Sequence, residues 1–103
     1  MMDKEDFLNE VKERIISLDN DAEIMLFGSR ARGDFKSTSD WDFLILLQKK
    51  ATEDFKEIIR NNLFDLELES NEVVSSIIHQ KNCWEELNIT PLYKIIQKEG
   101  IRL

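Results

Sequence analysis

The spacing of apolar residues divides the chain into alternating helical and extended segments. In residues 4–18 and 52–68, apolar side chains recur every three or four positions, which is the period of a helix packed on one side. Residues 23–27 form a short apolar run and residues 73–78 are rich in β-branched side chains, so both segments predict strands. The tail from residue 82 is predicted to be helical, with Thr90 and Pro91 suited to a helix start and Gly100 to its end.

Residues 40–47 predict the central strand of a sheet. Positions 43–47 are all apolar, and a strand without a polar face is covered on both sides, so we expect helices packed against it. Residues 28–39, rich in Gly, Ser, Arg and Asp, predict a loop that has room for one short helical turn. This order of elements predicts an α+β fold, a two-layer α/β arrangement in which helices pack on a mixed sheet.

Length and charge narrow the classes of function. The 103 residues suit a single domain spanning residues 1–103, and the modest core of so small a domain favours a partner protein or a homodimer. A net charge of −7 argues against bulk binding of nucleic acid, whose phosphates are repelled by an acidic surface. No apolar run approaches the roughly 18 residues of a membrane span, and one cysteine with one histidine cannot build a zinc site. We expect a cytoplasmic protein whose metal sites, if it has any, use carboxylate oxygens.

A candidate anion site follows the first predicted strand. Gly28 lets the backbone approach a ligand closely, and Ser29 adds a hydroxyl donor at the start of a turn whose N–H groups favour an anion. Arg30 and Arg32 can each make two hydrogen bonds to a phosphate group. For both arginines, ordinary solvent-exposed loop charge is the alternative interpretation.

A candidate metal site lies at the start of the predicted central strand. Side chains alternate along a strand, so Asp40 and Asp42 are expected on one side and Trp41 on the other, where it packs in the core or faces a partner. Two carboxylates in this arrangement can bridge a pair of divalent cations about 3.5–4 Å apart, as in the transfer of phosphoryl groups. Carboxylate ligands favour Mg²⁺ or Mn²⁺.

The joint motif resembles that of a known family. Gly28-Ser29, ten intervening residues and Asp40-x-Asp42 before an apolar strand are similar to the signature of the DNA polymerase beta-like nucleotidyltransferases. In its short length and its sequence Gly-Ser-Arg-Ala-Arg-Gly at residues 28–33, the chain resembles the minimal members of that group, the MNT proteins. The resemblance implies a nucleoside triphosphate held by Gly28 and Ser29, magnesium held by Asp40 and Asp42, and transfer of a nucleoside monophosphate, AMP from ATP, to a hydroxyl.

The same resemblance implies a partner and an alternative. Minimal members often accompany a HEPN-type toxin protein, and some attach AMP to a tyrosine of it, so an antitoxin role is expected. Active members usually carry a third carboxylate on a later strand, whereas the strand at 73–78 has no acid at its centre and only Glu72 at its edge. The alternative is therefore a catalytically weak or inactive module that neutralises a partner by binding it. Modification of an antibiotic hydroxyl is less favoured, because the chain leaves no room for a separate substrate-binding domain.

Overall fold

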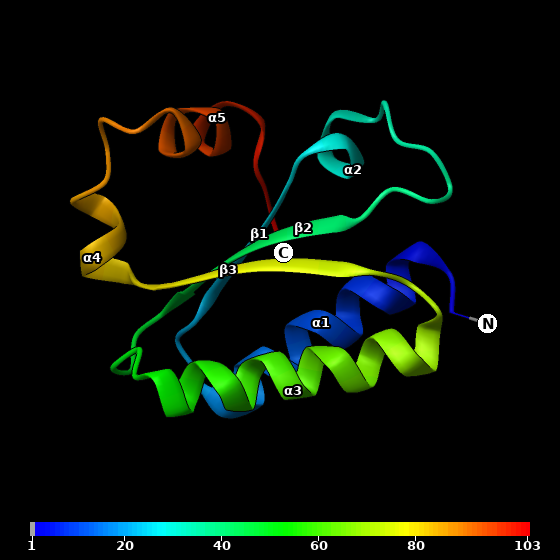
Figure 1. Cartoon of the computed structure of the whole chain (residues 1–103), viewed down its shortest axis with the longest axis horizontal. Helices are drawn as coiled ribbons and strands as arrows, with labels where there is room; N and C mark the ends of the chain where they lie inside the picture. Colours follow the sequence, from blue (N-terminus) through cyan, green and yellow to red (C-terminus); the bar gives the residue numbers. More distant parts are fainter. Residues whose placement is uncertain (1) are drawn as a thin grey trace.

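A computed structural model describes residues 2–103, and these form one sheet with helices on both of its faces (Figure 1). The elements are, in chain order, α1 (Lys4–Leu18), β1 (Glu23–Phe27), α2 (Ser29–Arg32), β2 (Trp41–Leu47), α3 (Glu53–Ser70), β3 (Val74–Gln80), α4 (Lys81–Glu85), α5 (Pro91–Glu99) and β4 (Ile101–Arg102). Among these residues, no helix is both long and apolar enough to cross a membrane.

Each of the three longer helices, α1, α3 and α5, begins at a residue whose side chain caps the first turn. The Asp3 side chain accepts a hydrogen bond from the Asp6 amide at the start of α1, and Thr52 does the same for Phe55 at the start of α3. Thr90 caps α5 and Pro91 follows it, as the sequence predicts. These caps satisfy amide groups that have no partner within the helix, so each helix begins at a defined residue.

The four strands form a mixed sheet in the order β3-β2-β1-β4. β2 pairs in parallel with β3 and antiparallel with β1, which also pairs antiparallel with β4. β2 therefore lies inside the sheet, with a strand on each side. The predicted α+β fold with a mixed sheet is confirmed, as is the inner position of the most apolar strand.

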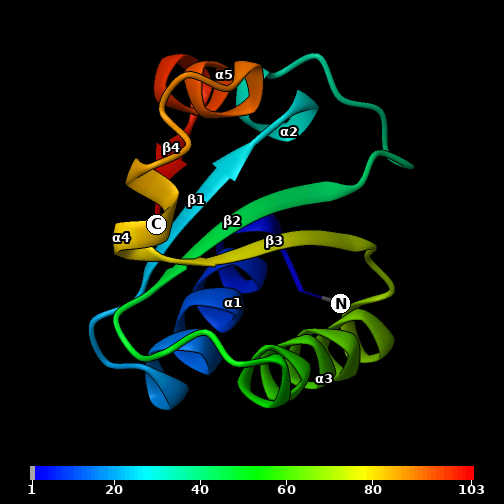
Figure 2. The same ribbon diagram turned by 60° about the vertical axis from the view of Figure 1, so that its left-hand side comes forward.

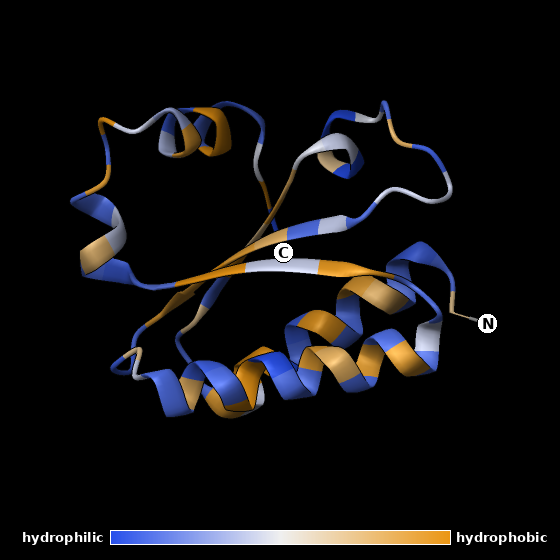
Figure 3. Cartoon of the chain, viewed as in Figure 1, coloured by the Kyte–Doolittle hydropathy of each residue, from blue (hydrophilic) through white to orange (hydrophobic). Residues whose placement is uncertain are grey.

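The sheet separates a large core from a smaller one. In Figure 3, α1 and α3 alternate between polar and apolar residues, and their buried side chains Phe7, Val11, Ile15, Ile59, Leu63 and Leu66 pack on one face of the sheet. Odd-numbered residues of β2 enter this large core, whereas Leu44 and Leu46 face Trp84 of α4 and Ile96 of α5 in the smaller core. The two-layer description thus holds for the large core, and α4 and α5 add a partial third layer.

The C-terminal third is more finely divided than the sequence predicts. β3 continues to Gln80, so His79 lies within a strand, and the helical tail is two helices rather than one. β4 was not predicted because it has only two residues and no measurable alternation. Its pairing with β1 brings the end of the chain back to the sheet.

A buried carboxylate fastens the turn after α1 to the end of β2. Asp19 is 2% exposed, and its Oδ2 accepts hydrogen bonds from the amides of Gln48 and Lys49 at 2.8 and 2.9 Å. Its Oδ1 accepts from the Asp21 amide at 3.2 Å. The side chain therefore satisfies three backbone donors that no regular element would satisfy.

We expect Asp19→Ala to lower the free energy of unfolding by about 1–3 kcal/mol, because three part-buried backbone hydrogen bonds to the Asp19 carboxylate are lost. Asp21→Ala is the matched control, since Asp21 is exposed and lies two residues away. Chemical denaturation of both variants measures the difference. Equal stabilities for the two variants would contradict the role given to Asp19.

Candidate active site

The site is assembled by the pairing of β1 with β2. Phe27, the last residue of β1, lies opposite Asp42, so Gly28 follows directly beside that aspartate. Gly28 has φ +76°, and a Cβ added to it would collide with Oδ2 of Asp42 and lie 3.1 Å from its Cγ. The Asp42 carboxylate therefore lies against the backbone of the Gly-Ser turn, and only glycine fits there.

The turn continues directly into the short helix α2. Its amide hydrogen bonds start with Ala31 and Arg32, which both donate to the Gly28 carbonyl at 3.0 Å. Ser29 and Arg30 precede them at the first positions of the helix, where N–H groups have no acceptor within the helix. The predicted short helical turn is confirmed, and its amino end lies next to Asp42.

The Asp42 carboxylate interacts electrostatically with Asp40, with Arg32 and with Glu99 from the tail of the chain. Partial burial raises the pKa of Asp42, and the negative charges of Asp40 and Glu99 raise it further, while the positive charge of Arg32 lowers it. Trp41 lies in the large core at 3% exposure, on the face of β2 opposite to Asp42. The expected separation of Trp41 from the aspartate is therefore present.

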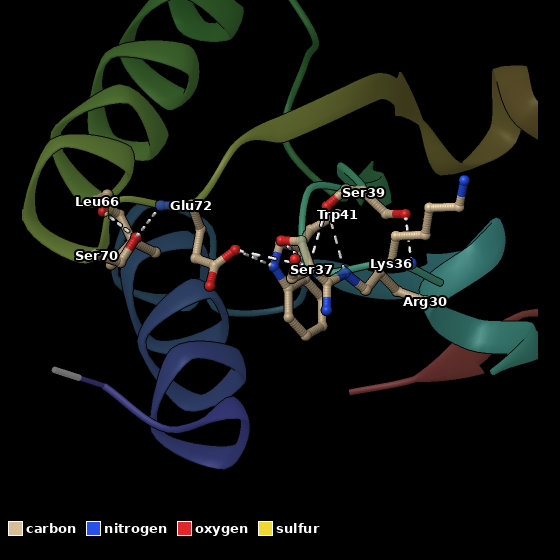
Figure 4. Close-up of polar contacts among 8 residues, drawn as sticks. All are labelled: Arg30, Lys36, Ser37, Ser39, Trp41, Leu66, Ser70 and Glu72. Atoms are coloured by element: carbon tan, nitrogen blue, oxygen red, sulfur yellow. Dashed lines mark hydrogen bonds and ion pairs between the residues drawn. The ribbon is translucent and has the colours of Figure 1, made fainter. Parts of the chain in front are cut away.

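Arg30 packs against Trp41, whose side chain lies on the face of β2 opposite to Asp42 (Figure 4). Its guanidinium donates to the carbonyls of Ser37 and Ser39 at 3.1–3.3 Å, and it stacks 4.4 Å from the ring centroids of both Phe35 and Trp41. The side chain is 8% exposed. This placement differs from the predicted phosphate contact, because Arg30 uses its donors to hold the loop that leads to Asp40.

Glu72 belongs to the same group of residues as Arg30. Its Oε2 accepts a hydrogen bond from Trp41 Nε1 at 3.0 Å and lies 3.8 Å from Arg30 Nη2 (Figure 4). These contacts hold Glu72 on the face of β2 that carries Trp41. Glu72, the acid at the edge of the third predicted strand, therefore lies on the face of the sheet opposite to Asp42 in this structure.

Arg32 lies on the same side as Asp42. Residues two apart on a helix are about 200° apart around its axis, so Arg30 and Arg32 point to opposite sides of α2. Arg32 donates through Nε to Asp34 Oδ2 at 3.2 Å and through Nη1 to both carboxylate oxygens of Glu99 at 3.0 and 3.3 Å. It is about half exposed, so it remains accessible to a ligand.

Two residues of this region were missed by reasoning from the sequence alone. Glu99, at the end of α5, is 57 residues from Asp42 in the chain and has no motif around it. Ser75 is the residue of β3 that pairs in register with Asp42, so it occupies the neighbouring position on the same face of the sheet. Only the register of β3, which the sequence did not provide, could have identified Ser75.

The donor set suits a hard divalent cation. Within residues 2–103, no three His, Cys, Asp or Glu side chains converge closely enough to hold a metal ion by themselves. Mg²⁺ at nucleotide sites commonly uses one or two carboxylates and completes its coordination with water and substrate phosphate oxygens. Asp40 and Asp42, next to the open turn at Gly28, fit that requirement.

Comparison with known families agrees with this geometry. Residues 7–103 match the nucleotidyltransferase domain family, so the match covers nearly the whole chain. A search of curated proteins found no significant match. The chain belongs to the nucleotidyltransferase domain family, and the sheet and turn described above are compatible with the fold of that family.

We expect Gly28→Ala to destabilise the fold more than Gly33→Ala. Both glycines have positive φ, but a Cβ at Gly33 meets no atom within 4 Å, whereas one at Gly28 strikes the Asp42 carboxylate. The strain of placing alanine at a positive φ costs about 1 kcal/mol in both variants. The additional loss of stability in Gly28→Ala therefore measures the steric clash with Asp42. Urea denaturation of both variants tests this, and equal losses would show that Asp42 moves aside freely.

We expect Asp42→Asn to stabilise the protein at neutral pH in EDTA, by up to about 1 kcal/mol given the partial exposure of the carboxyl group. A raised pKa in the folded state means that ionised Asp42 opposes folding, and that this effect disappears as the pH falls and the group is protonated. The extra stability of Asp42→Asn over the wild type should therefore be present at pH 7 and lost at about pH 3, where the Asp42 carboxyl group is protonated. Thermal unfolding measures it, with exposed Asp65→Asn as the control; a lower Tm for Asp42→Asn at pH 7 would contradict the sign.

Proposed function

We propose that this chain transfers a nucleoside monophosphate, AMP from ATP, to a hydroxyl group with the help of Mg²⁺ or Mn²⁺. Membership of the nucleotidyltransferase domain family supports nucleotidyl transfer in general. The observation that carries the specific proposal is the contact between Gly28 and Asp42, which places a turn suited to phosphate against a carboxylate suited to metal. Neither group would serve nucleotide transfer alone.

Each residue of the site has a distinct role in this proposal. Gly28, Ser29 and the first amides of α2 hold the phosphates, and Arg32 neutralises part of their charge. Asp40 and Asp42 ligate the metal, which when bound neutralises the developing charge on the phosphate oxygens. The acceptor oxygen attacks the α-phosphorus, its proton passes to water at the open site, and the bond from that phosphorus to the pyrophosphate leaving group breaks. Arg30 has no role at the phosphates, because its donors hold the loop at residues 37 and 39.

A protein partner is the favoured source of the acceptor hydroxyl. The groove lined by Arg32, Ile95, Lys98 and Glu99 is open to solvent, which leaves room for a protein partner to present a hydroxyl group. By resemblance to the minimal nucleotidyltransferases, we infer a HEPN-type toxin as partner and an antitoxin role in the cytoplasm.

The second candidate function is a catalytically weak or inactive module that neutralises its partner by contact. The observation in its favour is Ser75, which lies in register with Asp42 where a third carboxylate could stand. β3 then adds no carboxylate to Asp42 of β2 and to Asp40, which directly precedes that strand. Such a module would bind the partner without modifying it.

Transfer of label from ATP distinguishes the two candidates. We expect purified protein, Mg²⁺ and a candidate HEPN-type partner protein to transfer label from α-³²P-ATP to that partner, and no label from γ-³²P-ATP. Asp42→Asn should reduce the rate at least about 100-fold, because it removes a metal ligand. Glu72→Gln, on the opposite face of β2, is the matched control and should retain activity.

Ser75→Asp adds the carboxylate that β3 lacks. If the wild-type chain is limited by its missing acid, this variant should bind Mn²⁺ more tightly and raise the transfer rate from a low or undetectable value. Partner binding without transfer of label by either form would support the contact module and contradict the enzyme.

A further inference from the structure

The C-terminal helix places a carboxylate at the site from outside the motif. Glu99 ends α5, and its side chain is 14% exposed. The next residue, Gly100, caps the helix by donating to the Ile96 carbonyl at 2.8 Å, and β4 then pairs with β1. Since both sides of Glu99 are tied to regular structure, its position is set by the fold (Figure 2).

The partner of Glu99 is the arginine nearest to Asp42. Arg32 Nη1 donates to both oxygens of Glu99, and Arg32 Nε donates to Asp34. Arg32 is 49% exposed against 14% for Glu99, so the guanidinium is the member of the pair that a ligand can reach from solvent. A groove of about 450 Å³, lined by Arg32, Ile95, Lys98 and Glu99, gives it space to move.

The charges around Arg32 oppose a bare anion. Asp34 and Glu99 bind the guanidinium directly, and Asp42 lies near enough for Arg32 and Glu99 to affect its pKa. An incoming polyphosphate would compete with two carboxylates for the Arg32 guanidinium and would meet the repulsion of the aspartates as well. Lys98, which also lines the groove, supplies a further positive charge. A divalent cation on Asp40 and Asp42 would offset the negative charge of those two aspartates and so remove much of that repulsion.

We propose that Glu99 is a positioning residue that competes with polyphosphate for the guanidinium of Arg32, so that binding of the triphosphate requires exchange of this ion pair. The inference rests on the proposed function. It assigns Glu99 the task of keeping metal-free nucleotide out of the site, because without metal the exchange is unfavourable. With metal bound, the triphosphate takes over Arg32 and Glu99 is released from it.

Isothermal titration with inorganic tripolyphosphate in EDTA tests the exchange. We expect Glu99→Gln to bind tripolyphosphate about tenfold more tightly than the wild type, because Arg32 is freed and one negative charge is removed. The gain should disappear when Glu99→Gln is combined with Arg32→Gln and compared with Arg32→Gln alone. The ¹⁵N–¹H signal of the Arg32 side chain should shift on binding in the wild type, which reports the exchange directly.

Glu23→Gln is the matched control, because Glu23 pairs with Arg102 at 3.2 Å at the opposite end of β1 from Gly28. It should leave the affinity for tripolyphosphate unchanged, and circular dichroism should show all variants folded. An unchanged affinity of Glu99→Gln would overturn the inference, as would an equal gain in the Arg32→Gln background, which would indicate general repulsion.

The proposed function is tested separately by titrating a non-hydrolysable ATP analogue with Mg²⁺. If the wild type binds this analogue while Glu99→Gln shows no gain, the inference alone fails. If no form binds either the analogue or tripolyphosphate, the proposed function and the inference both fail.

Discussion

In the antiparallel pair of β1 and β2, Phe27 lies opposite Asp42, and the rest of the site depends on that register. The register is set by the alternation of side chains along β2. Its odd-numbered residues fill the large core, and Leu44 and Leu46 face α4 and α5. A slip of one residue would turn Asp42 into the apolar core and Trp41 towards the turn, at a prohibitive cost in buried charge. The same hydrophobic burial that stabilises the sheet therefore aligns the Gly-Ser turn with the aspartate.

The sheet also gives different tasks to residues that are close in the sequence. Arg30 and Arg32 belong to one four-residue helix, yet one holds the loop over the large core and the other faces the acidic side. Trp41 and Asp42 are neighbours that serve the core and the site respectively. Arg30 donates hydrogen bonds to the carbonyls of residues 37 and 39, so this arginine helps to place the loop that leads to Asp40.

Local patterns were sufficient to predict most of the fold. The helices at 4–18 and 52–68, the inner strand and the turn after Gly28 follow from periodicity and from residue types with a strong conformational preference. The joint motif indicated the family, which the family match supports. Contacts between distant segments could not be predicted in this way: Glu99 reaches Arg32 across 67 residues, and Glu72 meets Trp41 across 31. The directions of Arg30 and Glu72 depend on such contacts.

The two tryptophans of the chain lie on opposite faces of the sheet. Trp41 is buried in the large core beside Phe7, and Trp84 is buried in the smaller one between His79 and Tyr93. Both are about 3% exposed, so each senses the packing of its own layer. Intrinsic fluorescence therefore carries two separate optical signals, and replacing either indole with phenylalanine isolates the emission of the layer that retains the other.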